Sequence, residues 1–166
     1  EDEKELIAVT DKSSGESFII PEETFVDESY SIMSIYPTEN YLYYMKGRNS
    51  GVSIYRIKLS DMTREEIIKS SDTADKSILG LTFSWSDTEN RFSAVRLFTD
   101  EKNIYLIDKN GMVFVLNPFA EKITDCTCII EESVLGGCIF DGKAIYYIDE
   151  DGVQKMYNVV NKTFRI

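Results

Sequence analysis

Two stretches of this chain repeat each other, namely NIYLIDKNGMVFVLNPFAEKIT at 103–124 and AIYYIDEDGVQKMYNVVNKTFR at 144–165. A shift of 41 positions aligns them without a gap. The matched residues of the first stretch are Ile104, Tyr105, Ile107, Asp108, Gly111 and Asn117, and those of the second are Ile145, Tyr146, Ile148, Asp149, Gly152 and Asn158. Repetition at a fixed interval of about 20–50 residues is typical of solenoids, propellers and other repeat proteins.

A third copy lies upstream, in YLYYMKGRNSGVSIYRIKLSDMTREEI at 41–67. Its matched positions are Leu42, Tyr43 and Met45 in the first apolar run and Ile54 and Tyr55 in the second. The offset from the middle copy is 62 positions in the first run and 61 in the second, so the upstream loop is one residue longer. The repeat therefore occurs three times.

Each copy has the pattern of an antiparallel hairpin. Short runs rich in Tyr, Phe, Ile and Val are bounded by Gly, Asn, Asp and Ser, which predicts strands and turns. Asn110-Gly111 and Asp151-Gly152 separate the two runs, and such pairs favour positive φ at adjacent positions in a tight hairpin turn. The acidic residues at these turns thus have a structural explanation before any functional one.

Further strands are expected on both sides of each hairpin. Residues 93–98 and 136–140 predict the preceding strands, and 123–130 and 163–166 predict the following ones. Four antiparallel strands in about 41 residues is the size of one propeller blade. Residues 62–69 are the exception, since they could form a helical turn or a polar loop leading into a strand.

The whole chain, 1–166, is predicted to be one all-β domain of such units. Its parts are a partial unit at 1–30, full units at about 31–72, 93–134 and 135–166, and an inserted hairpin at about 73–92. Leu6–Val9 and Ser17–Ile20 predict a hairpin in the partial unit. The architecture favoured is a small or partial β-propeller, of four units or as part of a longer ring. A β-sandwich or a curved sheet of the same hairpins is the alternative.

Composition excludes several classes of protein. Hydrophobic residues make up 43% and aromatic residues 12%, which is too much for a disordered acidic tail. The chain has no histidine, so histidine-dependent catalysis and histidine metal sites are excluded. A net charge of −11 disfavours nucleic acid and anionic membranes as partners. No apolar run reaches the roughly 18 residues of a membrane-spanning helix, and the acidic start EDEKEL does not resemble a signal peptide.

Three cysteines form the first candidate site. Cys126 and Cys128 would share one face of a strand, and with Cys138 they could supply three thiolates to a zinc ion. A carboxylate such as Asp125 or Asp141 would have to complete the set. The other interpretations are one disulfide that involves Cys138, and thiols that pack as small hydrophobic groups, which we favour.

Acidic residues form the second candidate site. Asp149-Glu150-Asp151-Gly152, with Asp108 at the matching place in the preceding copy, resembles the start of a calcium loop. An EF-hand would need a glutamate at the twelfth position, where Val160 stands, so a hairpin turn explains these residues better. A hydrolase would need two facing carboxylates, one of raised pKa, and the sequence does not single out such a pair.

Motifs of other enzymes are missing. No Gly-x-Ser-x-Gly element appears, and Gly136-Gly137 lacks the context of a phosphate-binding loop. The tyrosines are the last candidates, as aromatic groups that pack in the core or stack on a ligand. They are Tyr41, Tyr43, Tyr44, Tyr55, Tyr105, Tyr146, Tyr147 and Tyr157 among ten. Adjacent members of the pairs 43–44 and 146–147 must point to opposite faces of a sheet.

The sequences YLYYM, SIYRIKLSD, AIYYIDEDG and KMYNV resemble the repeats of bacterial β-propeller domains of unknown function, similar to the YWTD-type propellers of low-density-lipoprotein receptors. The resemblance spans about 35–166. It implies blades of a ring, commonly of about six, that acts as an interaction platform, often outside the cell. This chain departs from the pattern by having too few units for such a ring and no full Tyr-Trp-Thr-Asp motif.

We therefore expect a non-enzymatic binding or scaffold module that presents propeller loops to a protein or glycan partner. No catalytic, metal-binding or cofactor-binding residue is assigned, and no cofactor is expected. The alternatives are an acid-pair hydrolase or lyase on a propeller scaffold, and a structural segment of a larger protein. Self-association through unpaired strand edges is a further expectation. The resemblance implies an extracellular or cell-envelope location in a bacterium, whereas the cysteines and the missing signal favour the cytoplasm.

Overall fold

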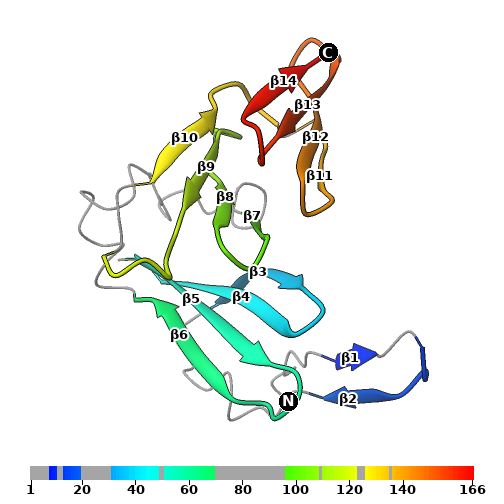
Figure 1. The fold of residues 1–166 in the computed structure, drawn as a ribbon, viewed down its shortest axis with the longest axis vertical. Helices are drawn as coiled ribbons and strands as arrows, with labels where there is room; N and C mark the ends of the chain where they lie inside the picture. The colour runs from blue at the N-terminus through cyan, green and yellow to red at the C-terminus, as the bar shows by residue number, and fades with distance from the viewer. Residues whose placement is uncertain are drawn as a thin grey trace.

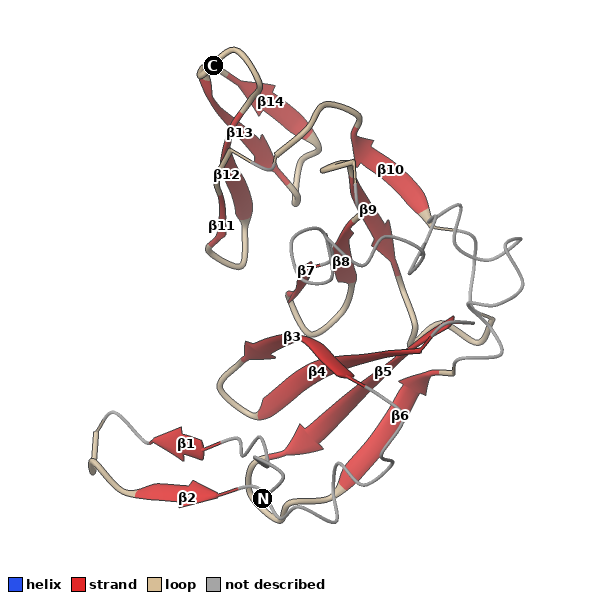
Figure 2. Ribbon diagram, turned by 180° about the vertical axis from the view of Figure 1, so that it is seen from behind, coloured by secondary structure: helices blue, strands red, loops and turns tan. Residues whose placement is uncertain are grey.

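The computed structural model describes residues 8–10, 13–19, 31–48, 51–69, 96–108, 110–122, 126–134 and 136–166. All regular elements within these ranges are strands, which confirms the all-β class (Figure 2). The strands are β1 (Ala8–Thr10), β2 (Ser17–Ile19), β3 (Ser31–Pro37), β4 (Tyr41–Arg48), β5 (Gly51–Lys58), β6 (Arg64–Ile68), β7 (Arg96–Thr99), β8 (Ile104–Ile107), β9 (Val113–Leu116), β10 (Thr127–Ile130), β11 (Cys138–Phe140), β12 (Ala144–Ile148), β13 (Gln154–Asn158) and β14 (Thr163–Arg165).

Three four-stranded sheets carry the fold (Figure 1). The first sheet has the order β3-β4-β5-β6, the second β7-β8-β9-β10 and the third β11-β12-β13-β14, and every neighbouring pair is antiparallel. Each sheet is therefore a simple meander, and the predicted four-stranded repeat is confirmed. Strands β1 and β2 pair separately as the N-terminal hairpin. The predicted inserted hairpin at 73–92 lies outside the described residues.

The helical interpretation of 62–69 is wrong, because Arg64–Ile68 forms strand β6. Its register places Glu65 opposite Arg56, and the two side chains form an ion pair of 2.7 Å. Ile68 pairs with Ile54, and both are buried. Glu and Lys favour helices only weakly, and pairing with β5 overrides that preference.

The hairpin turns also differ from the prediction, because the positive φ lies at the glycine alone. Gly111 has φ 83° and Gly152 has φ 80°, whereas the preceding Asp151 does not adopt a positive φ. At the later turn, Gly152 N–H donates to the Asp149 carbonyl and Asp149 N–H donates to the Val153 carbonyl, both at 3.1 Å. This pattern is a type I turn followed by a left-handed residue, a three-residue connection in which glycine is favoured at the last position.

The sheets stack in series, each using its two faces for two different neighbours. Alternation along β8 points Ile104 and Leu106 to one side and Tyr105 and Ile107 to the other. We call the Ile104 side of the second sheet its rear face and the Tyr105 side its forward face, and we apply the same names to equivalent residues of the other sheets. The 41-position and 62-position shifts define these equivalents.

Forward faces pack on rear faces at both junctions. At the first junction Tyr43, Met45, Ile54 and Ile68 of the first sheet pack on Leu97, Ile104, Leu106, Phe114 and Leu116 of the second. At the second junction Phe98, Tyr105, Ile107, Val113 and Ile130 of the second sheet pack on Phe140, Ile145, Tyr147 and Tyr157 of the third. The rear face of the first sheet is buried as well, with Val9 of the N-terminal hairpin packed against it. The three sheets therefore stack in the same orientation at both junctions, with a forward face on a rear face.

Aromatic rings join the first strands of all three sheets at one point. Tyr36 of β3 lies edge-on to Phe98 of β7, with ring centroids 5.8 Å apart, and 6.4 Å from Phe140 of β11. Phe98 and Phe140 are 5.9 Å apart, and Tyr105 lies 5.2 Å from Phe140. Such pairs contribute about 0.5–1.5 kcal/mol each beyond the burial of their area. We call these four residues the aromatic hub.

The described sheets do not close into a ring, so a four-unit closed propeller is not what this chain forms. The N-terminal hairpin and the third sheet lie at opposite ends of the longest axis in both views (Figures 1 and 2). The forward face of the third sheet is exposed, with Ile139 69% accessible. Within the described ranges no helix has the length and apolar character needed to cross a membrane.

Truncation of Phe140 tests the aromatic hub. Phe140→Ala removes a ring that three others contact, and we expect the free energy of unfolding to fall by about 3–5 kcal/mol, as for other buried phenylalanines. Urea unfolding at neutral pH measures the change. Val160→Ala is the control, since Val160 is 74% exposed and its loss should change stability by less than about 0.5 kcal/mol. Equal effects of the two substitutions would contradict this role of the hub.

Three tyrosines occupy the same repeat position but differ in what their hydroxyls bind. Tyr105 donates to Asp100 at 2.9 Å, and Tyr146 donates to Asp141 at 3.2 Å. The Tyr43 hydroxyl is buried and no carboxylate of the described residues accepts from it; the group that faces it is the guanidinium of Arg56, its register partner on β5. The position that corresponds to Asp100 holds Thr38 in the first copy, and its shorter hydroxyl is engaged with Tyr41.

Substitution by phenylalanine should therefore have unequal consequences for stability at two equivalent positions. Tyr105→Phe loses a hydrogen bond to a carboxylate, and we expect it to cost about 1.5–3 kcal/mol of stability. Tyr43→Phe removes a hydroxyl that faces Arg56 and that no carboxylate accepts from, so its loss of stability should be clearly smaller than that of Tyr105→Phe. Urea unfolding of both variants beside the parent chain checks the difference. A loss of similar size in Tyr43→Phe would show that its hydroxyl is satisfied.

Candidate functional site

Three loops meet between the second and third sheets and enclose a polar groove of about 390 Å³. They are the β8–β9 turn, the β10–β11 connection and the β12–β13 turn. The lining residues are Asn110, Met112, Glu131, Glu132, Ser133, Asp149, Glu150, Asp151 and Lys155. We call this feature the acidic groove, because five of its nine residues are Asp or Glu and one is Lys.

Two repeat-equivalent aspartates fix the turns that border the groove. Asp108 Oδ1 accepts hydrogen bonds from the backbone N–H groups of Asn110 and Met112, both at 2.9 Å. Asp149 Oδ1 accepts from the backbone N–H groups of Asp151 at 3.0 Å and Val153 at 2.8 Å. Both aspartates are buried. A short carboxylate that accepts backbone N–H groups two and four residues on holds such a turn in one conformation.

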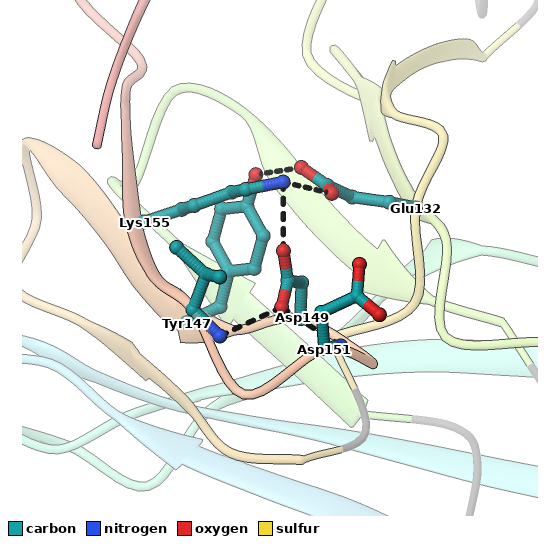
Figure 3. Close-up of polar contacts among 6 residues, drawn as sticks. Glu132, Tyr147, Asp149, Asp151 and Lys155 are labelled. Atoms are coloured by element: carbon teal, nitrogen blue, oxygen red, sulfur yellow. Dashed lines mark hydrogen bonds and ion pairs between the residues drawn. The ribbon is translucent and has the colours of Figure 1, made fainter.

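Lys155 ties the third sheet to the β10–β11 connection (Figure 3). Its Nζ lies 2.5 Å from Glu132 Oε2 and 2.8 Å from Asp149 Oδ2. The hydroxyl of Tyr147 donates to the other oxygen of Glu132. Lys155 and Tyr147 are register partners on β13 and β12, so their side chains leave the sheet on the same side. We call these four residues the lysine network.

The network keeps its groups charged. Hydrogen bonds from Lys155 and then Tyr147 lower the pKa of Glu132, and the hydrogen bond from Lys155 followed by that of the Val153 amide lowers the pKa of Asp149. The hydrogen bonds to Asp149 and Glu132 raise the pKa of Lys155. Burial, followed by the hydrogen bond to Glu132, raises the pKa of Tyr147. At neutral pH this part of the groove therefore holds two carboxylates, one ammonium group and a neutral phenol.

The network has the wrong electrostatics for acid–base hydrolysis. A glycosidase needs one carboxyl group that stays protonated near neutral pH, which requires a raised pKa. Glu132 and Asp149 share one lysine, and the pKa of each is lowered. Glu132 and Asp149 are thus poor proton donors, and the ammonium group of Lys155 holds the two carboxylates together.

The calcium interpretation of the β12–β13 turn is also not supported by the contacts. One oxygen of Asp149 accepts two backbone N–H groups and the other faces Lys155, so both already have protein partners. Asp108 is engaged in the same way by its own turn. Over the described ranges no group of three or more His, Cys, Asp or Glu side chains is arranged to hold a metal ion. Asp149 shapes the backbone of its turn, and Glu150 and Asp151 are exposed.

The cysteines belong to two different packing clusters. Cys126 and Cys128 pack at the junction of the first and second sheets, and Cys138 packs at the junction of the second and third. All three are thiols rather than disulfides. Burial raises the pKa of Cys138 to about 11, so this thiol stays protonated at neutral pH. Asp141 accepts the backbone N–H groups of its own turn, and Asp125 lies outside the described residues.

The tyrosines follow the expected alternation. Tyr43 packs at the junction of the first and second sheets, and Tyr44 packs on the rear face of the first. Tyr147 is 3% exposed at the second junction, whereas its neighbour Tyr146 is 44% exposed on the forward face of the third sheet. Most of the repeat tyrosines therefore pack in the core, and Tyr146 is the member that a ligand or partner can reach.

Glu132 and Lys155 were not singled out by the sequence. Lys155 stands where Phe114 stands in the preceding copy, so a charged residue replaces a buried ring within the repeat. Such a break in a repeated apolar pattern is a signal that could have identified it. Glu132 gives no comparable signal, because it lies in a connection that has no aligned partner.

The sequence matches no family model, and no curated protein matches it.

Replacing Lys155 tests the lysine network through the pH dependence of stability. Folding lowers the pKa of Asp149 and Glu132 from the values of the unfolded chain, about 3.8 and 4.5. Each carboxylate therefore stabilises the fold at a pH above its unfolded pKa, and this contribution is lost as the pH falls through its folded pKa. Lys155→Met should lower stability at pH 7 and flatten the decline between about pH 5 and 3.

Urea unfolding from pH 7 to pH 3 measures this difference. Lys143→Met is the matched control, because Lys143 is an exposed lysine of the turn between β11 and β12, outside the network. We expect the free energy of unfolding of Lys143→Met to fall between pH 7 and pH 3 as steeply as that of the parent chain. Parallel curves for Lys155→Met and the parent would contradict the coupling of the two carboxylates to Lys155.

Proposed function

We propose that this chain is a non-enzymatic binding module, a scaffold of propeller-type blades that holds the acidic groove open to a protein partner. The partner presents Lys or Arg side chains. The observation that carries this proposal is the convergence of three loops, two of them held by Asp108 and Asp149, on a groove with a large excess of carboxylates.

The stacking supports the propeller arrangement. Each sheet is a four-stranded meander, forward faces meet rear faces, and the first strands β3, β7 and β11 are joined by the aromatic hub. The outer strands β6, β10 and β14 lie away from this point (Figure 1). Propellers place the first strand of each blade near a common axis and fan the others outward. The three sheets are then successive blades of an open arc, in keeping with the resemblance of their hairpins to propeller repeats.

Charge supports a basic partner. Lys155 is already neutralised by Glu132 and Asp149, so the exposed Glu131, Glu150 and Asp151 leave the rim negative. A cationic segment gains from this potential, whereas an anionic one is repelled. Sugars are commonly held on exposed aromatic rings, and the lining of the acidic groove contains no aromatic side chain among the described residues. The groove thus favours a basic peptide over a glycan.

Titration of the isotope-labelled chain with two peptides tests this function. A decapeptide rich in Lys and Arg should shift the amide NMR signals of Asn110, Glu131 and Asp151 saturably, and a Glu-rich decapeptide should not. The affinity should fall as salt is raised, since exposed charges are screened. Glu131→Gln together with Glu150→Gln should weaken binding about 3–10-fold, the effect of removing two rim charges.

The control replaces two exposed acids elsewhere, Glu39→Gln together with Glu121→Gln, and should leave the affinity unchanged. Oligosaccharides and chromogenic glycosides are tested beside the peptides. Equal loss in the control variant, or no saturable shift with the basic peptide, would overturn the proposal. Turnover of a glycoside that disappears in Glu132→Gln would instead establish the hydrolase alternative.

A further inference from the structure

The forward face of the third sheet is an apolar surface without a partner among the described residues. Ile139, Tyr146 and Met156 are successive register partners across β11, β12 and β13, so they form one row on this face. Ile139 is 69% exposed and Tyr146 44%, and Ile148 lies beside them with 36%. They line a shallow cavity of about 520 Å³ that also reaches Arg165 and Ile166.

This surface is the repeat equivalent of a face that is buried in the sheet before it. A shift of 41 positions aligns Ile139 with Phe98, Tyr146 with Tyr105, Ile148 with Ile107 and Met156 with Val115. In the second sheet Phe98, Tyr105 and Ile107 are at most 8% exposed, because the rear face of the third sheet covers them. The same pattern holds one junction earlier, where Tyr43 and Met45 are buried by the second sheet.

We propose that the forward face of the third sheet docks a fourth four-stranded unit of this same repeat. That unit presents a rear face of the kind formed by Ile145, Tyr147 and Tyr157, with aliphatic and aromatic side chains on alternate positions of its two central strands. The proposal continues a stacking mode that the chain uses at two junctions, and it goes beyond the binding of a partner in the acidic groove.

A second copy of this chain is not the occupant. Forward faces pair with rear faces at both junctions, so a second copy would have to offer its own first rear face. That face is closed, since Leu42, Tyr44 and Ile57 are at most 3% exposed and Val9 of the N-terminal hairpin packs against it. A symmetric dimer would pair two forward faces, an arrangement that neither junction uses.

Extension of the chain by one unit tests this proposal. A second copy of residues 135–166 is appended to the full chain. The rear face of this appended unit is then available to pack on the forward face of the original third sheet. We expect one cooperative urea transition with a higher midpoint and an m-value larger by about a fifth, because m scales with the surface buried on folding. A separate or absent transition of the appended unit would overturn the proposal.

Substitutions on the proposed face separate docking from a general effect on the fold. Ile139→Ser together with Ile148→Ser should cancel the rise in midpoint in the extended chain and leave the unextended chain unchanged, because both residues are exposed there. A matched control places Tyr147→Asp in the appended copy only, and it should cancel the same rise. Equal losses in the extended and unextended chains would show that the two isoleucines act within their own sheet.

Sedimentation of the unextended chain examines the second-copy alternative. Any self-association over a hundredfold range of concentration, including pairing of strand edges, should be the same with and without the two isoleucine substitutions. A dimer that Ile139→Ser together with Ile148→Ser abolishes would show that a second copy covers this face, and would overturn the proposal.

Discussion

The packing of one sheet's forward face on the next sheet's rear face is the interaction on which this structure depends. Each four-stranded meander has two apolar faces, and one sheet alone would leave both in water. The aromatic hub fixes where the sheets meet, because Tyr36, Phe98 and Phe140 come from the first strands of three different sheets. Loops that are far apart in the sequence are brought together by this stacking.

The acidic groove is a consequence of the same arrangement. Its walls are turns whose conformation is set locally by Asp108 and Asp149, which accept backbone N–H groups in equivalent ways. Asp149 also faces Lys155, so one residue both shapes a turn and anchors the contact with Glu132. The side chains at this end of the sheets are mostly polar, and hydrogen bonds and ion pairs hold several of them in place. The exposed forward face of the third sheet is apolar, so the two surfaces differ in chemistry.

Alignment of the three copies shows where equivalent residues make different contacts. Tyr43 and Tyr105 occupy the same place, but Thr38 stands where Asp100 supplies an acceptor, so the Tyr43 hydroxyl faces Arg56 and has no carboxylate to donate to. Lys155 replaces a buried ring and creates the lysine network. Such differences are visible once the repeat is aligned, although their consequences depend on which side chains meet in space.

The sequence by itself determined most of the strands, the positions of their hairpin turns and the four-stranded repeat, because alternation of side chains and turn-forming residues are local properties of the chain. Only the tertiary structure decided that Arg64–Ile68 is a strand, since its pairing with β5 is not a local property. The stacking of sheets likewise decided that Glu132 meets Lys155 and that the cysteines separate into two junctions. These features depend on contacts between residues that are distant in sequence, and they cannot be predicted from composition or from the spacing of residue types.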